Sequence, residues 1–131
     1  CMFEGVTIDF IAPDELQIPD HIIGARAHSK GQDIDITSCD VLYVTRIQEE
    51  RFECHDDFLS YKGSYVVNAR LLEQAKEKMI VMHPLPRVDE ISTDVDCDPR
   101  AAYFRQCQNG MFMRMAILHW LIEGTFLMGL S

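Results

Sequence analysis

A proline-rich segment directly after an apolar run constrains the fold of this chain more than any other feature. The apolar sequence MIVM occupies residues 79–82 and is followed at once by HPLPRVDEI at residues 83–91. Proline has no backbone N–H to donate, so a strand of a sheet must end before Pro84 and Pro86. The segment therefore predicts a stiff, charged loop at the carboxyl end of a strand, which is the edge where open α/β sheets bind ligands.

Patterns typical of strands and of helices alternate along the chain. Short β-branched and apolar runs predict strands at residues 6–11, 41–44, 64–67 and 79–82, with a weaker one around Ile34 and Ile36. The run at residues 41–44 is apolar throughout, as in a strand buried on both faces. Helices are expected at residues 20–29, 56–61 and 68–78, the last capped by Asn68. This alternation predicts an α/β fold with a mostly parallel sheet flanked by helices, in three layers.

The last part of the chain predicts one long helix. Apolar residues recur at intervals of three to four between Tyr103 and Leu121, and Asp98 with Pro99 makes a suitable helix start. The simplest interpretation of its methionines and aromatic residues is a helix that packs in a core. No run of about 18 apolar residues occurs, so we expect no membrane span.

Composition narrows the class of protein. The chain has 131 residues, 47% of them hydrophobic, which suits one domain with a real core. A net charge of −9 argues against a nucleic-acid partner, because binding phosphates needs clustered cations. The 5 cysteines are widely spaced and no basic leader opens the chain, so we expect reduced thiols and a cytoplasmic location. The abrupt start leads us to expect a piece of a longer protein.

Two loops carry the polar side chains that suit a binding site. The sequence TRIQEERF follows one predicted strand at residues 45–52, as HPLPR follows the other. Parallel strands end at the same edge, so Arg46 and Arg87 can offer two guanidiniums, each suited to a carboxylate or phosphate. Gln48 adds a neutral donor and acceptor, and Glu50 can clamp Arg46. Spacing leaves open the alternative of ordinary surface charges that pair with acidic neighbours, namely Glu49, Glu50, Asp89 and Glu90.

Other polar groups point less clearly to chemistry. His83 is a general acid or base, or else a histidine that fixes the loop by a hydrogen bond to the backbone; we favour the second because the sequence fixes no partner carboxylate. Cys54 and His55 lack the spacing of a zinc site, and the acidic sequence at residues 94–98 departs from a calcium loop at Pro99. Motifs for nucleotides, zinc proteases and serine hydrolases are absent from the sequence. We therefore predict no metal and no cofactor.

Several segments in the same order closely resemble one enzyme family. They are TRIQEERF at residues 45–52, HPLPRVDEI at 83–91 and DPRAAYFRQ at 98–106, together with NGMFMRMA at 109–116 and IAPD at 11–14. These resemble aspartate carbamoyltransferase over nearly the whole chain. The related ornithine enzymes carry a cysteine in place of Pro84 and lack the pair Arg46 and Gln48. The resemblance therefore implies aspartate as the second substrate.

The resemblance implies a fold and a reaction. The chain is expected to be the second, aspartate-binding domain of a carbamoyltransferase, spanning residues 1–131. The family transfers the carbamoyl group of carbamoyl phosphate to L-aspartate, giving N-carbamoyl-L-aspartate and phosphate in pyrimidine synthesis. The terminal helix, about residues 100–131, is expected to pack back on a carbamoyl phosphate domain that is missing here. The implied assembly is a homotrimer of catalytic chains, with regulatory chains or fused pyrimidine-pathway domains as possible partners.

The resemblance also implies roles for individual residues. Arg46 and Gln48 would grip the aspartate carboxylate, with Glu50 orienting Arg46. The backbone around Leu85 and Pro86 would hold the reacting amino groups, and the bond between these two residues is expected to be cis. The supporting residues are His83, Arg87 and Asp89. No catalytic side chain is assigned.

Departures from the family pattern leave a second reading open. The phosphate-binding motifs of the family are missing, so this chain alone is expected to be inactive. The stretch between Ile22 and Asp40 is shorter than in the family, and Glu49 replaces a usual Lys or Arg. The alternative is a non-catalytic carbamoyltransferase-like domain that acts in assembly or regulation.

Overall fold

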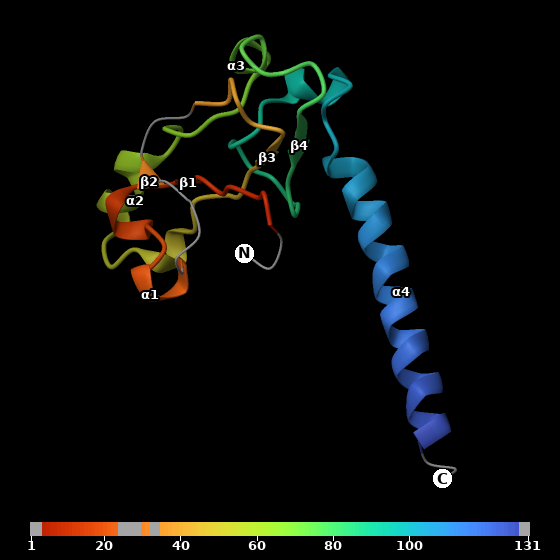
Figure 1. Cartoon of the computed structure of the whole chain (residues 1–131). Helices are drawn as coiled ribbons and strands as arrows, with labels where there is room; N and C mark the ends of the chain where they lie inside the picture. The colour runs from red at the N-terminus through yellow and green to blue at the C-terminus, as the bar shows by residue number, and fades with distance from the viewer. Residues whose placement is uncertain (1–3, 24–29, 32–34, 129–131) are drawn as a thin grey trace.

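The structure, a computed structural model, describes residues 4–23, 30–31 and 35–128. Its strands are β1 (Phe10–Ile11), β2 (Lys30–Gly31), β3 (Val41–Tyr43) and β4 (Ile80–Met82). Its α-helices are α1 (Asp20–Ile23), α2 (His55–Tyr61), α3 (Ala69–Leu72) and α4 (Tyr103–Met128). Three 3₁₀ turns complete the described part: η1 (Asp14–Leu16), η2 (Glu49–Arg51) and η3 (Thr93–Cys97). The fold is α/β, as predicted (Figure 1).

Parallel pairing organises the strands. β1 pairs with β2, and β3 pairs with β4 so that Val41 lies opposite Ile80 and Tyr43 opposite Met82. A single parallel bridge joins Val81 to Ala101, just before α4 begins. Parallel pairing of β3 and β4 puts their carboxyl ends on one edge, so the loops that follow them leave the sheet together.

A small core lies between the second strand pair and the segments that cover it. Leu72, Val81, Val95 and Tyr103 are fully buried, and Met79 is nearly so. Apart from Met79, which directly precedes β4, these residues come from α3, β4, η3 and the first turn of α4, so the core ties the loop after β4 to its surroundings. By contrast, Val41 and Tyr43 of β3 are about half exposed, at 49% and 55%. The prediction of a strand buried on both faces is therefore wrong for β3.

Most predicted elements are shorter in the structure. Strand pairing begins only at Phe10, and Ile36 is buried without belonging to a strand. The predicted strand at residues 64–67 is reduced to one bridge from Val67 to Ile91. Asn68 does cap α3, accepting a hydrogen bond from the Leu71 N–H at 2.9 Å, but the helix ends at Leu72, before the predicted end at residue 78. Ile34 and residues 24–29 lie outside the described residues.

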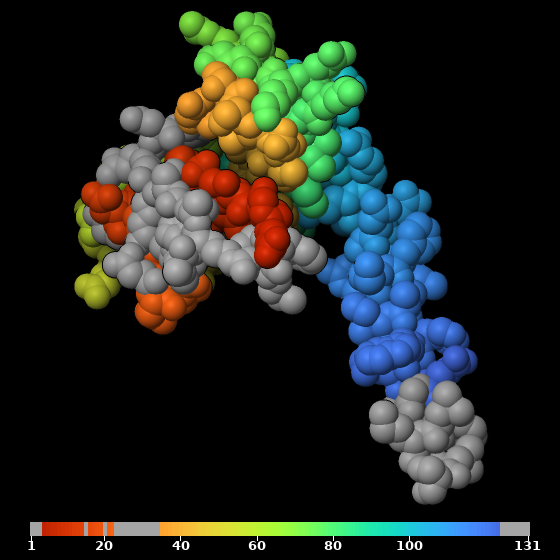
Figure 2. Space-filling model, in the orientation of Figure 1, coloured from red at the N-terminus to blue at the C-terminus, as the bar shows by residue number. Residues whose placement is uncertain are grey.

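The long C-terminal helix is present, but its surroundings differ from the prediction. α4 extends away from the strands as a single rod (Figures 1 and 2). It begins at Tyr103 rather than at Pro99, because Asp98 binds the Arg100 side chain and backbone instead of capping a helix. Large apolar side chains on all sides of the rod are exposed, including Trp120 at 72% and Ile122 at 70%. The interpretation of this stretch as core is therefore wrong within the chain itself.

Among the described residues, no helix is both long and apolar enough to cross a membrane.

Candidate functional site

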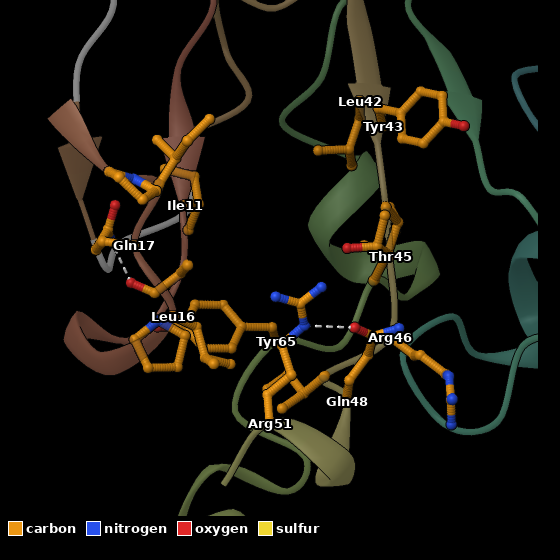
Figure 3. Close-up of a pocket in the computed structure, with 17 residues that line it drawn as sticks. Ile11, Leu16, Gln17, Leu42, Tyr43, Thr45, Arg46, Gln48, Arg51 and Tyr65 are labelled. Atoms are coloured by element: carbon orange, nitrogen blue, oxygen red, sulfur yellow. Dashed lines mark hydrogen bonds between the residues drawn. The ribbon is translucent and has the colours of Figure 1, made fainter. Parts of the chain in front are cut away.

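A cavity of about 770 Å³ opens between the ends of β1 and β3. One wall is the loop after β1, from Ala12 to Pro19, and the other is β3 with the loop that follows it, from Thr45 to Gln48 (Figure 3). Tyr65 closes part of the floor. The carboxyl ends of strands from two separate pairs thus face one space, as in ligand sites of open α/β folds. The lining is mostly apolar, with cationic and amide side chains at one end.

Arg46 and Gln48, to which the resemblance gives the role of holding aspartate, both line this cavity. Arg46 Nη2 donates to Glu50 Oε1 at 2.9 Å, so the predicted clamp between these residues is present. Hydrogen bonds from its own backbone N–H and from Arg46 lower the pKa of Glu50. Both side chains are largely exposed, at 45% and 65%, so this pair aims the guanidinium without fixing it firmly.

Arg51 was not considered from the sequence, yet it is the cation beside the Gln48 amide. Its Nε donates to Gln48 Oε1 at 2.8 Å, and the Arg51 and Arg46 guanidiniums lie on opposite sides of that amide (Figure 3). Because the oxygen of Gln48 accepts from Arg51, the Nε2 group of Gln48 is left to donate. The loop therefore presents donors, which suits an anionic ligand.

The loop after β4 is held in place by a buried pair of side chains, His83 and Glu90. The Leu85–Pro86 bond is cis, as expected, and Leu85 has a positive φ of 47°. The Leu85 N–H donates to His83 Nδ1 at 2.8 Å, which confirms that His83 fixes the loop through the backbone. The other nitrogen, Nε2, lies 2.7 Å from Glu90 Oε1, a carboxylate that we had named only as a surface partner for arginine.

The Glu90 carboxylate contacts three other residues of this loop. Its Oε2 accepts from the backbone N–H groups of Val88 and Asp89, each at 3.1 Å. Burial by itself would raise the pKa of Glu90, but hydrogen bonds from its own backbone N–H, from Val88, His83 and Asp89 outweigh burial and lower it. A carboxylate in this place is therefore ionised and fully engaged.

Arg87 has a different partner from those the sequence suggested. It forks onto Asp96 of η3, with Nη2 to Oδ2 at 2.6 Å, and its guanidinium lies over the Tyr103 ring. The Tyr103 hydroxyl donates to the same carboxylate, at 2.5 Å. Hydrogen bonds from Arg87 and Tyr103 lower the pKa of Asp96 to about 2, and burial with the bond to Asp96 raises the pKa of Tyr103 to about 12. The guanidinium of Arg87 is thus occupied, and the prediction that it joins Arg46 as a ligand fork is not supported by this geometry.

A second, smaller cavity of about 260 Å³ lies on the other side of Arg46. Asp89 and Glu90 line it together with Arg46 and Lys62. The loop after β3 and the loop after β4 therefore face each other here, as parallel strand ends predict. Asp89 lies at this junction, and Leu85 is half-buried against the core.

Comparisons with known proteins agree with one another. The family model described as "Aspartate/ornithine carbamoyltransferase, Asp/Orn binding domain" matches residues 1–121. The aspartate carbamoyltransferase catalytic subunit of Bifidobacterium longum is 45% identical over 125 residues, covering 89% of this chain and 39% of that protein. The multifunctional protein CAD of Squalus acanthias is 43% identical over 120 residues, covering 86% of this chain and 5% of that protein.

Solved structures give the same picture. The catalytic subunit of M. jannaschii aspartate transcarbamoylase matches with a TM-score of 0.80 at 45% identity, covering 93% of this chain and 42% of that one. The Trypanosoma cruzi enzyme in complex with aspartate and phosphate matches with a TM-score of 0.76 at 43% identity, covering 86% and 40%. The chain thus spans about two-fifths of the length of such relatives.

Proposed function

The chain belongs to the aspartate/ornithine carbamoyltransferase family, as its amino-acid-binding domain, and on this basis we propose that it supplies the aspartate-binding half of an aspartate carbamoyltransferase. That enzyme would transfer the carbamoyl group of carbamoyl phosphate to L-aspartate in pyrimidine synthesis, giving N-carbamoyl-L-aspartate and phosphate. The observation that carries the proposal is the donor-rich end of the larger cavity, where Arg46, Gln48 and Arg51 line the space between two strand ends.

The chemistry of aspartate suits this arrangement. Aspartate carries two carboxylates, so its site needs donors held in place despite the net charge of −9. A guanidinium meets a carboxylate with two parallel hydrogen bonds, and the Gln48 Nε2 group adds a neutral donor. The backbone carbonyls of Leu85 and Pro86 would receive the amino groups that react. Bringing the amine and the carbamoyl carbon together supplies much of the rate without a metal or a covalent intermediate.

The rest of the enzyme would complete the site and the assembly. The exposed apolar rod of α4 would pack on the carbamoyl phosphate domain, because a helix apolar on all sides is stable in water only when it is covered. The catalytic chains would form a homotrimer in the cytoplasm, alone, with regulatory chains or in a fusion such as the multifunctional relative. This chain by itself would bind aspartate weakly and would not turn over.

The test joins this chain to the missing half. A chimera places it behind the part of the Bifidobacterium longum relative that it does not match, and release of N-carbamoyl-aspartate is measured with aspartate or with ornithine. Turnover with aspartate alone is the expected result. A folded chimera that binds carbamoyl phosphate but carbamoylates neither amino acid would overturn the proposal.

One observation favours the non-catalytic alternative. Glu49, which stands where the family usually has a cation, pairs with His55 Nδ1 at 2.7 Å and adds negative charge beside Arg46. In an assembly or regulatory domain, aspartate binding is dispensable. The same chimera separates the readings, because the non-catalytic domain would fold and assemble with the first domain yet show no aspartate-dependent turnover.

A further inference from the structure

The loop after β4 contains a carboxylate, Glu90, to which neither the family resemblance nor the proposed substrate contacts give a role. We propose that Glu90 is a positioning residue: acting through His83, it fixes the backbone of Leu85, which the proposed function places against the reacting amino group. Its effect on turnover rests on the proposed function. The chain of hydrogen bonds from Glu90 to Leu85 is independent of it and can be tested separately.

Four hydrogen-bond contacts make up this relay. Glu90 Oε1 lies 2.7 Å from His83 Nε2, and His83 Nδ1 lies 2.8 Å from the Leu85 nitrogen. Glu90 Oε2 accepts from the Val88 and Asp89 nitrogens at 3.1 Å each. One carboxylate thus holds the loop at both ends of the proline pair: directly after it, and through the imidazole before it.

The protons can be placed by elimination. A backbone N–H can only donate, so Nδ1 of His83 must accept from Leu85 and carries no proton. The proton of the neutral imidazole is then on Nε2, and it points at Glu90. Glu90 accepts at both oxygens, which only a carboxylate can do. Ionised Glu90 therefore selects the one histidine tautomer that can hold the Leu85 N–H.

Glutamine at position 90 would fit in shape but not in hydrogen bonding. One end of its amide is an NH₂ group, which must face either the His83 Nε2–H or the N–H groups of Val88 and Asp89. Either orientation sets donor against donor in a site where His83 is 2% and Glu90 is 6% exposed. Unpaired donors in such a buried place are costly, so Glu90→Gln loosens the relay without removing volume.

The relay also reaches the long helix. Gln106 of α4 accepts from the His83 backbone N–H at 2.9 Å, so His83 is anchored at its main chain as well as at its ring. His83 therefore cannot follow Glu90 freely when the contact is weakened. The part of the loop that remains free to shift is Leu85 with its carbonyl.

The first test is hydrogen exchange of single amides in this chain, comparing the wild type with Glu90→Gln. The Val88 and Asp89 amides lose their acceptor and should exchange about tenfold faster or more. The decisive amide is Leu85, which does not touch Glu90: the relay requires it to accelerate by a similar factor. The Val81 and Ala102 amides, bonded within the core, should stay protected and report that the chain is folded.

Glu77→Gln is the matched control, since Glu77 is an exposed glutamate that lies before β4 and outside this loop, and it should leave all these amides unchanged. If Leu85 keeps its protection in Glu90→Gln while Val88 and Asp89 lose theirs, Glu90 acts only locally and the relay is wrong.

A second pair of variants keeps the test decisive if Glu90→Gln fails to fold. The oxygen of asparagine can stand in for Nδ1 of histidine, whereas glutamine reaches the place of Nε2. His83→Asn should therefore retain part of the Leu85 protection, and His83→Gln should lose it. Equal exchange of Leu85 in both variants would contradict the acceptor role of Nδ1.

The kinetic test uses the chimera described above. A positioning role predicts that Glu90→Gln lowers kcat by about 10- to 100-fold, as misplacement of reacting groups does, with the KM for aspartate changed little. Unchanged kcat in an active chimera would overturn the role in turnover. An inactive wild-type chimera would instead count against the proposed function. The exchange rate of the Leu85 amide would still show whether Glu90 acts on Leu85 through His83.

Discussion

The loop after β3 and the loop after β4 start at neighbouring strand ends but are held in different ways. In the first, the pairs of Arg46 with Glu50 and of Arg51 with Gln48 join residues four and three apart, and all four side chains are exposed. In the second, contacts reach from the loop to η3 and to α4 and are at least partly buried. Close pairs shape a loop without fixing its place, whereas distant pairs fix its place.

This difference suits the two halves of a binding site. Exposed ion pairs contribute little to stability, so the donors after β3 can change partners when an anion arrives. The backbone after β4 is bound through the buried side chains of His83 and Glu90, so its carbonyls stay where the fold puts them. The loop after β3 would supply charged donors that can move, and the loop after β4 would supply backbone groups at fixed positions.

The strongest way to break this comparison is to remove Asp96. Asp96→Ala leaves Arg87 and the Tyr103 hydroxyl without their shared acceptor, and Tyr103 is fully buried. Hydrogen bonds to a charged group are worth about 1.5–3 kcal/mol, so we expect the free energy of unfolding to fall by about 2–3 kcal/mol. Urea denaturation followed by circular dichroism measures it. Glu77→Ala, on an exposed residue, should stay within about 0.5 kcal/mol of the wild type; a similar small change in Asp96→Ala would show that the second loop is not anchored through η3.

A pair of arginine variants tests whether the loop after β3 serves mainly ligand binding and the loop after β4 mainly stability. Arg46→Ala should leave the unfolding free energy within about 0.5 kcal/mol of the wild type, because its ion pair is exposed. In the chimera it should raise the KM for aspartate by about 10- to 100-fold, from the loss of a charged contact.

Arg87→Ala should do the reverse, lowering stability and changing the aspartate KM less than Arg46→Ala does. Urea titrations and initial rates on the same preparations separate the two. Equal effects of both variants on KM would mean that Arg87 contacts the ligand after all.

Acid should weaken the fixed loop through its carboxylates. The pKa of Asp96 is about 2 in the folded chain, below its ordinary value of 3.8, so its contribution is complete above pH 3.8 and is lost as the pH falls towards 2. The lowered pKa of Glu90 acts in the same direction. The urea midpoint, measured between pH 6 and pH 2.5, should fall more steeply in the wild type than in Asp96→Asn. Parallel profiles would contradict the assignment.

The motifs predicted where the loops lie, but not what holds them. Strand ends and the pair of Arg46 with Glu50 follow from residues close in sequence, and the cis bond at Pro86 is implied by the family resemblance. The partner of Arg87 is Asp96, nine residues away, which only the fold brings near. Helical periodicity likewise predicts α4 but cannot say whether its partner lies within the chain, and here its apolar faces are exposed.

The smallest expected effect concerns Glu49, which adds negative charge beside the adjustable loop. Glu49→Lys changes the local charge by two units a few residues from Arg46, and it also removes the pair with His55. Both groups of that pair are more than half exposed, so stability should hardly change. Exposed charges are screened within about 10 Å at 0.1 M salt, so the gain in aspartate affinity should be only about two- to threefold there and should grow as salt is lowered. Aspartate KM of the chimera at two salt concentrations measures it, with Glu53→Lys as the control for a charge change of the same size. An effect at Glu49 that ignores salt would point to a direct contact, and the first loop would then be a more fixed part of the site than its exposed pairs indicate.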